Sequence, residues 1–156
     1  MKTKLLSALL IASALVAAPV LAADAYGNNS PEWVGCYRGA RNPDLVKNFN
    51  DINVATSSGK PLQAEQVKQA IVQAGKAKGW TVSTLSDNRL LATINVRGKH
   101  TVSVEIPYSS NKYSLLYKDS TNLHHAVCEG HAYIHPSYNK WVNTLQREIQ
   151  SKLMDL

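Results

Sequence analysis

The sequence predicts an α+β fold: a two-layer sandwich in which two helices pack on one face of an antiparallel β-meander of about four strands. Three observations predict it. Apolar residues recur three and four positions apart over residues 67–74, apolar and polar residues alternate through much of residues 80–123, and helical spacing returns after Pro136. Because alternating strands present one apolar and one polar face, the sheet is expected to be covered on a single side.

The chain begins with the features of a secretory signal peptide. Lys2 and Lys4 precede an apolar run of 12 residues, Leu5 to Val16, and Val20-Leu21-Ala22 offers small residues for cleavage. The run is too short for a membrane span and no stop-transfer charges follow it. We predict cleavage after Ala22, with Ala25 as the alternative, and a periplasmic or secreted protein that has no transmembrane segment after cleavage.

Three parts are expected along the chain: a signal peptide at 1–22, an N-terminal extension at 23–61 tethered by Cys36, and an α+β domain at 62–156. The mature chain has the length of one domain. Its net charge falls from +6 to +4, because Lys2 and Lys4 leave and no acidic residue does. The remaining basic residues are scattered, so nucleic acid is not an expected partner.

Cys36 and Cys128 are the only cysteines, and export would bring them into an oxidising compartment. We therefore predict a Cys36–Cys128 disulfide, with two free thiols as the alternative. It would close a loop of about 90 residues, for which the chain-entropy model gives roughly 4–5 kcal/mol as an upper value.

Within the extension, the alternation of residues 51–57 suggests a short strand. The first helix is expected to start after Gln63, with Gln66 in the capping-box position, and to end before Gly79. Strand patterns follow at residues 80–85, 90–96, 102–106 and 113–117, with Arg97-Gly98-Lys99 as a hairpin turn.

The last helix is expected to begin at Pro136, a favourable first helical residue. The residues of its apolar stripe are Tyr138, Val142, Leu145 and Ile149.

The order of these motifs resembles a family of small, uncharacterised bacterial periplasmic proteins and lipoproteins. The resemblance rests on the helix ending in Gly79-Trp80, on "YSLLYKDSTNL" at 113–123, and on "IHPSYNKWVNTLQREI" at 134–149 with its Tyr-Asn-x-Trp-Val motif. It spans about residues 62–153 and implies a fold and a compartment but no activity. This chain departs from the family pattern in its long segment around Cys36 and in the His-rich stretch before Ile134.

That stretch, "HHAVCEGHAYIHP" at residues 124–136, suggests a metal site. Imidazoles bind Zn or Cu; the candidate ligands are His124, His125, His131 and His135, with Glu129 as a further one. The spacing matches no zincin motif. The alternative is a solvated loop in which His135 caps the last helix.

The sequence gives little support for a catalytic site. Asp119 and Ser120 beside a histidine suggest a triad, but the sequence has no G-x-S-x-G elbow, and Asp119-Ser120 also suits the end of a strand. Trp33 and Tyr37, which flank Cys36, form a candidate binding patch. We therefore expect a non-enzymatic exported binding or accessory envelope protein whose partner is an envelope protein, a peptide or a glycan. The alternative is an envelope protein that binds metal through the histidines.

Overall fold

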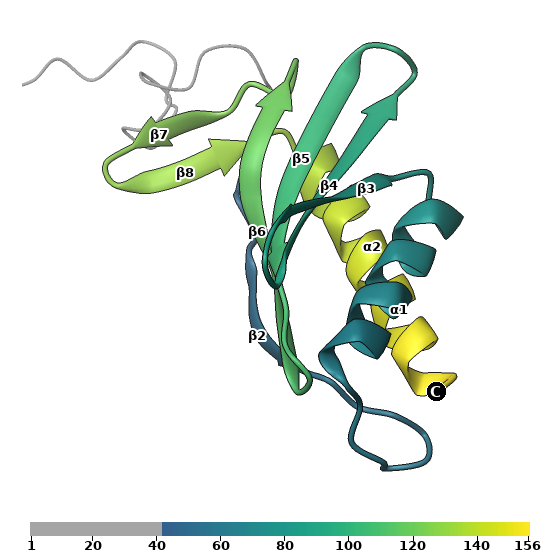
Figure 1. Cartoon of the computed structure of the whole chain (residues 1–156). Helices are drawn as coiled ribbons and strands as arrows, with labels where there is room; N and C mark the ends of the chain where they lie inside the picture. The colour runs from purple at the N-terminus through teal and green to yellow at the C-terminus, as the bar shows by residue number, and fades with distance from the viewer. Residues whose placement is uncertain (1–41) are drawn as a thin grey trace, which may run out of the picture. The chain divides into compact units, whose positions relative to one another are not determined.

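The computed structural model describes residues 42–156, which contain two helices and eight strands (Figure 1). The elements in chain order are β1 (Asp44–Leu45), β2 (Phe49–Asn53), α1 (Ala64–Ala77), β3 (Thr81–Ser86), β4 (Arg89–Val96), β5 (His100–Pro107), β6 (Lys112–Thr121), β7 (Ala126–Cys128), β8 (His131–Ile134) and α2 (Ser137–Met154). No helix of this part is both long and apolar enough to cross a membrane. The predicted signal peptide lies outside the described residues.

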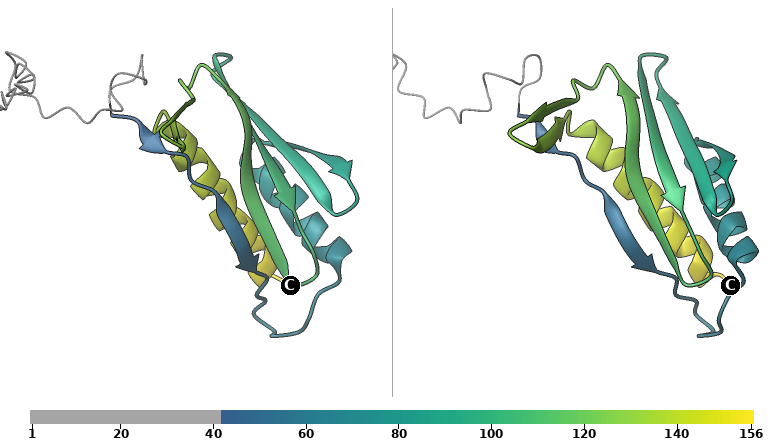
Figure 2. Two further views of the ribbon diagram at one scale, coloured as in Figure 1. Left: turned by 90° about the vertical axis from the view of Figure 1, so that its left-hand side faces the viewer. Right: turned by 60° about the vertical axis from the view of Figure 1, so that its left-hand side comes forward.

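The larger sheet has five antiparallel strands in the order β2-β6-β5-β4-β3, and both helices cover one of its faces (Figures 1 and 2). The α+β class is confirmed, with five strands in place of about four. The additional strand, β2, comes from the predicted extension. It overlaps the short strand expected at residues 51–57 but lies earlier, and its alternation is interrupted because Asp51 has a left-handed φ of 49° and the register with β6 shifts between Phe49 and Ile52.

Three side chains fasten the segment that carries β1 and β2. Asn139 of α2 accepts a hydrogen bond from Lys47 N (3.0 Å) and donates one to Leu45 O (2.9 Å). Asn48 accepts one from Tyr117 N (2.8 Å), and the Ser114 hydroxyl accepts one from Asp51 N (2.9 Å). Part of the 23–61 region is thus built into the same fold as the domain that follows it.

The core lies between the sheet and the helices. The apolar stripe predicted for the first helix is buried as Val67, Ala70, Ile71 and Ala74, and that of the second as Tyr138, Val142, Leu145 and Ile149. On β5, the side chains of Val102, Val104 and Ile106 are fully buried, whereas those between them are only half-buried. The sheet therefore has one face in the core and one open face.

The ends of α1 follow their sequence signals. Gln63 N donates to the Gln66 side chain (2.8 Å) at the start of the helix. At its end Gly79 has a φ of 77°, and Trp80 N donates to Gly75 O (2.8 Å). The chain then reverses into β3, and a Cβ at Gly75 would clash with the Val82 side chain. The glycine lets α1 and β3 approach closely.

The smaller sheet has the order β1-β8-β7. Its hairpin turns at Glu129 and Gly130, whose φ angles of 51° and 79° are typical of a type I′ turn. The His-rich stretch is therefore largely a short β-hairpin and not the solvated loop expected as the alternative. Three-residue β7 is too short to show alternation, and its hairpin pairs with β1 from the far end of the described chain.

Candidate functional site

The four predicted metal ligands do not form a ligand group. Within residues 42–156, no three His, Cys, Asp or Glu side chains lie close enough together to hold a metal ion. His124 has a left-handed φ of 52°, and His131 starts β8 beyond the hairpin turn. The N-cap of the last helix is Pro136 and not His135 as the alternative expected, although His135 Nδ1 accepts a hydrogen bond from Ser137 N (3.1 Å). Here the helix starts one residue after Pro136.

His125 joins an aromatic cluster instead. Its ring stacks on Tyr117 with 4.4 Å between centroids and 17° between planes. Tyr138 meets Tyr117 edge-on at 5.4 Å, and its buried hydroxyl has no hydrogen-bond partner within the described part of the chain. Burial is the main reason that the pKa of the Tyr138 hydroxyl is raised, and the neighbouring Tyr117 adds to it. The cluster packs the end of β6 against α2.

The suggested triad at Asp119 and Ser120 is not supported by the hydrogen bonds at that site. The Ser120 hydroxyl is hydrogen-bonded to the Tyr117 hydroxyl at 3.0 Å. Burial raises the pKa of Tyr117; the bond to Ser120 lowers it in part, and Asp119 raises it further. A phenol with a raised pKa stays protonated near neutral pH, so Tyr117 is a poor base for activating Ser120.

Only one residue of the predicted disulfide and aromatic patch, Cys128, lies within the described residues. Cys128 is 3 % exposed and is not a free thiol. Cys36, Trp33 and Tyr37 lie outside the described residues, so the Cys36–Cys128 pairing and the aromatic patch stay predictions.

The Tyr-Asn-x-Trp-Val motif has a structural role at each position. Tyr138 and Val142 are fully buried, and Asn139 holds the β1 segment. Trp141 is half-buried, and its ring lies 6.2 Å from that of His100. The motif therefore explains how α2 attaches to both sheets and does not indicate a binding site.

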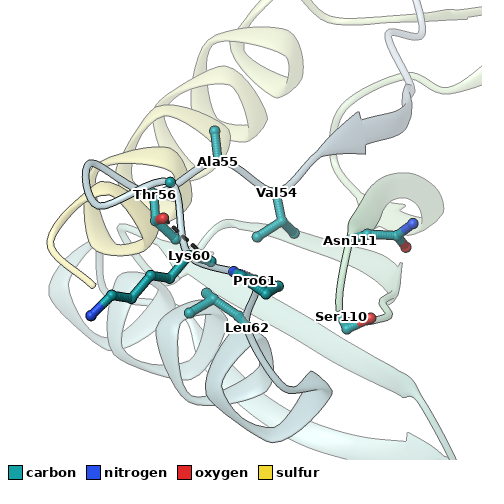
Figure 3. Close-up of a pocket in the computed structure, with 9 residues that line it drawn as sticks. Val54, Ala55, Thr56, Lys60, Pro61, Leu62, Ser110 and Asn111 are labelled. Atoms are coloured by element: carbon teal, nitrogen blue, oxygen red, sulfur yellow. Dashed lines mark hydrogen bonds between the residues drawn. The ribbon is translucent and has the colours of Figure 1, made fainter.

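A hollow of about 370 Å³ lies between the loop after β2 and the turn joining β5 to β6 (Figure 3). The residues that line it are Val54, Ala55, Thr56, Gly59, Lys60, Pro61, Leu62, Ser110 and Asn111. Lys60 is its one charged residue, and Figure 3 shows that side chain extending away from Ser110 and Asn111. The lining has no acid and no imidazole, so its one ionisable side chain, Lys60, has no partner in the lining for acid–base catalysis.

The sheet edges offer a clearer candidate. An edge strand exposes unpaired backbone N–H and C=O groups, and proteins usually protect it with charges, bulges or short length. Edge strand β2 has a bulge and a charge at Asp51, while β1 and β7 have two and three residues. The remaining edge, β3, has six residues of sequence TVSTLS, no charge, and a register irregularity only near its end, between Thr84 and Ser86. It is the longest edge strand of the described chain and the least protected.

β3 is also accessible. Five of its six residues are exposed, and among the described residues the only backbone hydrogen bonds that it makes are those to β4. Val82 lies opposite buried Ala92 and so faces the helices, whereas Ser83 lies opposite Leu91 on the open face. Strand-like alternation predicted this element, but nothing local in the sequence indicated that it would form an edge.

An apolar residue lies on the helix beside this edge. Val72 of α1 is 37 % exposed and precedes Gly75 by three residues, so both lie on one flank of the helix. Gly75 contacts β3, and that flank therefore lies next to the strand edge. β3 and Val72 together are called the β3 edge site below.

Comparison of the chain with models of known protein families, with curated proteins and with solved structures finds no match. The family resemblance noted in the sequence stays a prediction.

Proposed function

We propose that the protein is an exported, non-enzymatic binding or accessory protein of the bacterial envelope that engages a partner polypeptide by strand addition at the β3 edge site. The observation that carries the proposal is the open β3 edge: six uncharged, mostly exposed residues at the end of a five-stranded sheet. The N-terminal sequence pattern supports export to the periplasm or the cell exterior.

The chemistry of recognition follows from the backbone. In an antiparallel ladder, alternate residues of an edge strand direct their N–H and C=O groups away from the sheet. An extended partner segment satisfies these groups, and its alternate side chains determine specificity. On the helix side the partner's side chains would meet Val82 and Val72, so a β-branched or other apolar residue suits that position.

A peptide-display selection on the immobilised, oxidised mature protein tests this proposal. Selected peptides are expected to share alternating β-branched residues and to shift the backbone amide NMR signals of residues 81–85. Thr84→Lys should weaken the binding of these peptides by about tenfold. Thr84 lies opposite buried Leu90, so the substitution points a charge toward the helices. Asn50→Lys on exposed β2 is the matched control and should leave binding unchanged.

Peptides that shift signals elsewhere and bind Thr84→Lys normally would contradict the proposal. The metal-binding alternative has its own test, since a ligand at about 100 times its dissociation constant adds roughly 2.7 kcal/mol. We expect Zn²⁺ or Cu²⁺ to leave the melting temperature unchanged. A rise that disappears in His131→Ala/His135→Ala would favour the metal-binding protein instead.

A further inference from the structure

We infer that the strand added at the β3 edge site is β3 of a second copy of this chain, so that two five-stranded sheets join edge to edge in a symmetric dimer. The inference rests on the proposed function because it assigns a partner to the same edge. It depends on three features: the composition of β3, the charges at its two ends, and the state of the opposite sheet edge.

The composition of β3 suits pairing with itself. A two-fold interface brings the same patch of both subunits together, so a charged strand would face its own charge, and β3 has none. With the two-fold axis at Ser83 and perpendicular to the sheet, Val82 lies opposite Thr84 of the second copy. Both side chains point toward the helices and form β-branched pairs that favour strand association. The register shift falls between Thr84 and Ser86, so residues 82–84 keep regular pairing.

The ends of β3 carry opposite charges. Lys78 follows the last helical residue of α1 just before the strand, and Asp87 lies in the turn just after it. Antiparallel pairing about Ser83 places Asp87 of each copy opposite Gly79 of the other, next to Lys78. Lys78 is already paired with Glu148 of its own subunit at 2.9 Å, so this contact adds little affinity; it favours antiparallel over parallel pairing, which would bring like charges together.

The opposite edge limits the assembly to two copies. If both edges of the sheet were open, pairing would continue into a filament. β2 is interrupted by its bulge at Asp51, and Lys47 lies over the Phe49 ring at 4.7 Å at the same edge. One open and one protected edge predict a closed dimer.

Analytical ultracentrifugation of the oxidised mature protein at about 1–200 μM is the first test, a range that covers the weak association expected of a small interface. We expect a reversible monomer–dimer equilibrium. Ser83→Lys should raise the dimer dissociation constant by about tenfold or more, because the two introduced lysines face each other at the axis. Asn50→Lys adds the same charge to the exposed β2 edge and should leave the constant unchanged. A monomer at every concentration, or a dimer insensitive to Ser83→Lys, would overturn the inference.

Ser83→Cys gives a second measurement that does not depend on weak association. Directly opposed residues of antiparallel strands have Cβ atoms about 4.5–5.5 Å apart, near the separation that a disulfide needs. Mild oxidation should cross-link this variant into a dimer much faster than Asn50→Cys, and equal rates would count against β3 pairing. If the protein stays monomeric while selected peptides still bind β3, the dimer is wrong and the strand-addition function survives. If the protein stays monomeric and no selected peptide binds β3, both the dimer and the strand-addition function are wrong.

Discussion

The two edges of the five-stranded sheet differ in how they end. At β2 the chain is bulged at Asp51 and held by backbone N–H groups that donate to the side chains of Asn48, Ser114 and Asn139. At β3 the strand is uncharged, mostly exposed and bonded on one side to β4. An unprotected edge strand invites aggregation. The contrast with the protected β2 edge on the opposite side of the sheet therefore supports our proposal that β3 pairs with a partner. The difference can be tested by disturbing each edge separately.

The largest expected effect comes from the support of β3. Gly75→Leu would place a side chain where even a Cβ clashes with Val82, and such overpacking costs about 3 kcal/mol. Urea unfolding should show this loss, and amide exchange should rise in β3 before the other strands of the sheet. Ala77→Leu, on an exposed position of the same helix, should stay within about 0.5 kcal/mol of wild type. Equal stability of the two variants would show that α1 does not position the β3 edge.

The next largest effect is expected from the hydrogen bonds that join α2 to the segment just before β2. Asn139→Ala removes the hydrogen bonds to Lys47 N and Leu45 O and should cost about 1–2 kcal/mol. Amide exchange of residues 44–49 should rise, while β3 stays as in the wild-type protein. Asn143→Ala, about one turn further along α2, is the matched control. A uniform rise over both edges would mean that Asn139 supports the whole fold and not this segment.

The sequence predicted the parts of the fold whose information is local. Both helices and β4, β5 and β6 appeared because regular spacing records which side chains face the core. The bounds of β2 were misplaced, at 51–57, because the left-handed residue at Asp51 interrupts its alternation. The β7–β8 hairpin was missed because three and four residues cannot show a period. These strands depend on pairing with distant segments, such as Leu45 with Tyr133.

The candidate site, too, was predictable only where its structure depends on local sequence. The strand at residues 81–86 was expected, but its open edge follows from the order of all five strands and from the bulge in β2. The histidines gave a strong compositional signal for a metal. Their positions depend on a hairpin turn and on a stack against Tyr117, and neither can be read from the spacing of the residues.

The smallest expected effect concerns pH and the start of β3. Lys78 Nζ lies 2.9 Å from a Glu148 oxygen and joins the end of α1 to α2, while Lys152 lies 3.7 Å from the other oxygen. The hydrogen bond from Lys78 is the main reason that the pKa of Glu148 is lowered, and the charges of both lysines contribute. The unfolded chain therefore takes up this proton at a higher pH than the folded protein does. The contribution to stability is complete above the usual carboxyl pKa and is lost as the pH falls through the lowered value.

Glu148→Gln should accordingly reduce the melting temperature slightly at pH 7, and this difference should shrink as the pH falls below the usual carboxyl pKa and through the lowered value. The difference at pH 7 should shrink in 0.5 M NaCl, because the pair is accessible to solvent and screened by salt. Glu65→Gln is the matched control, since Glu65 forms a more exposed pair with Lys68 at 3.5 Å on a single helix. If both variants show the same pH dependence, the Lys78–Glu148 pair does not hold the helix end from which β3 starts.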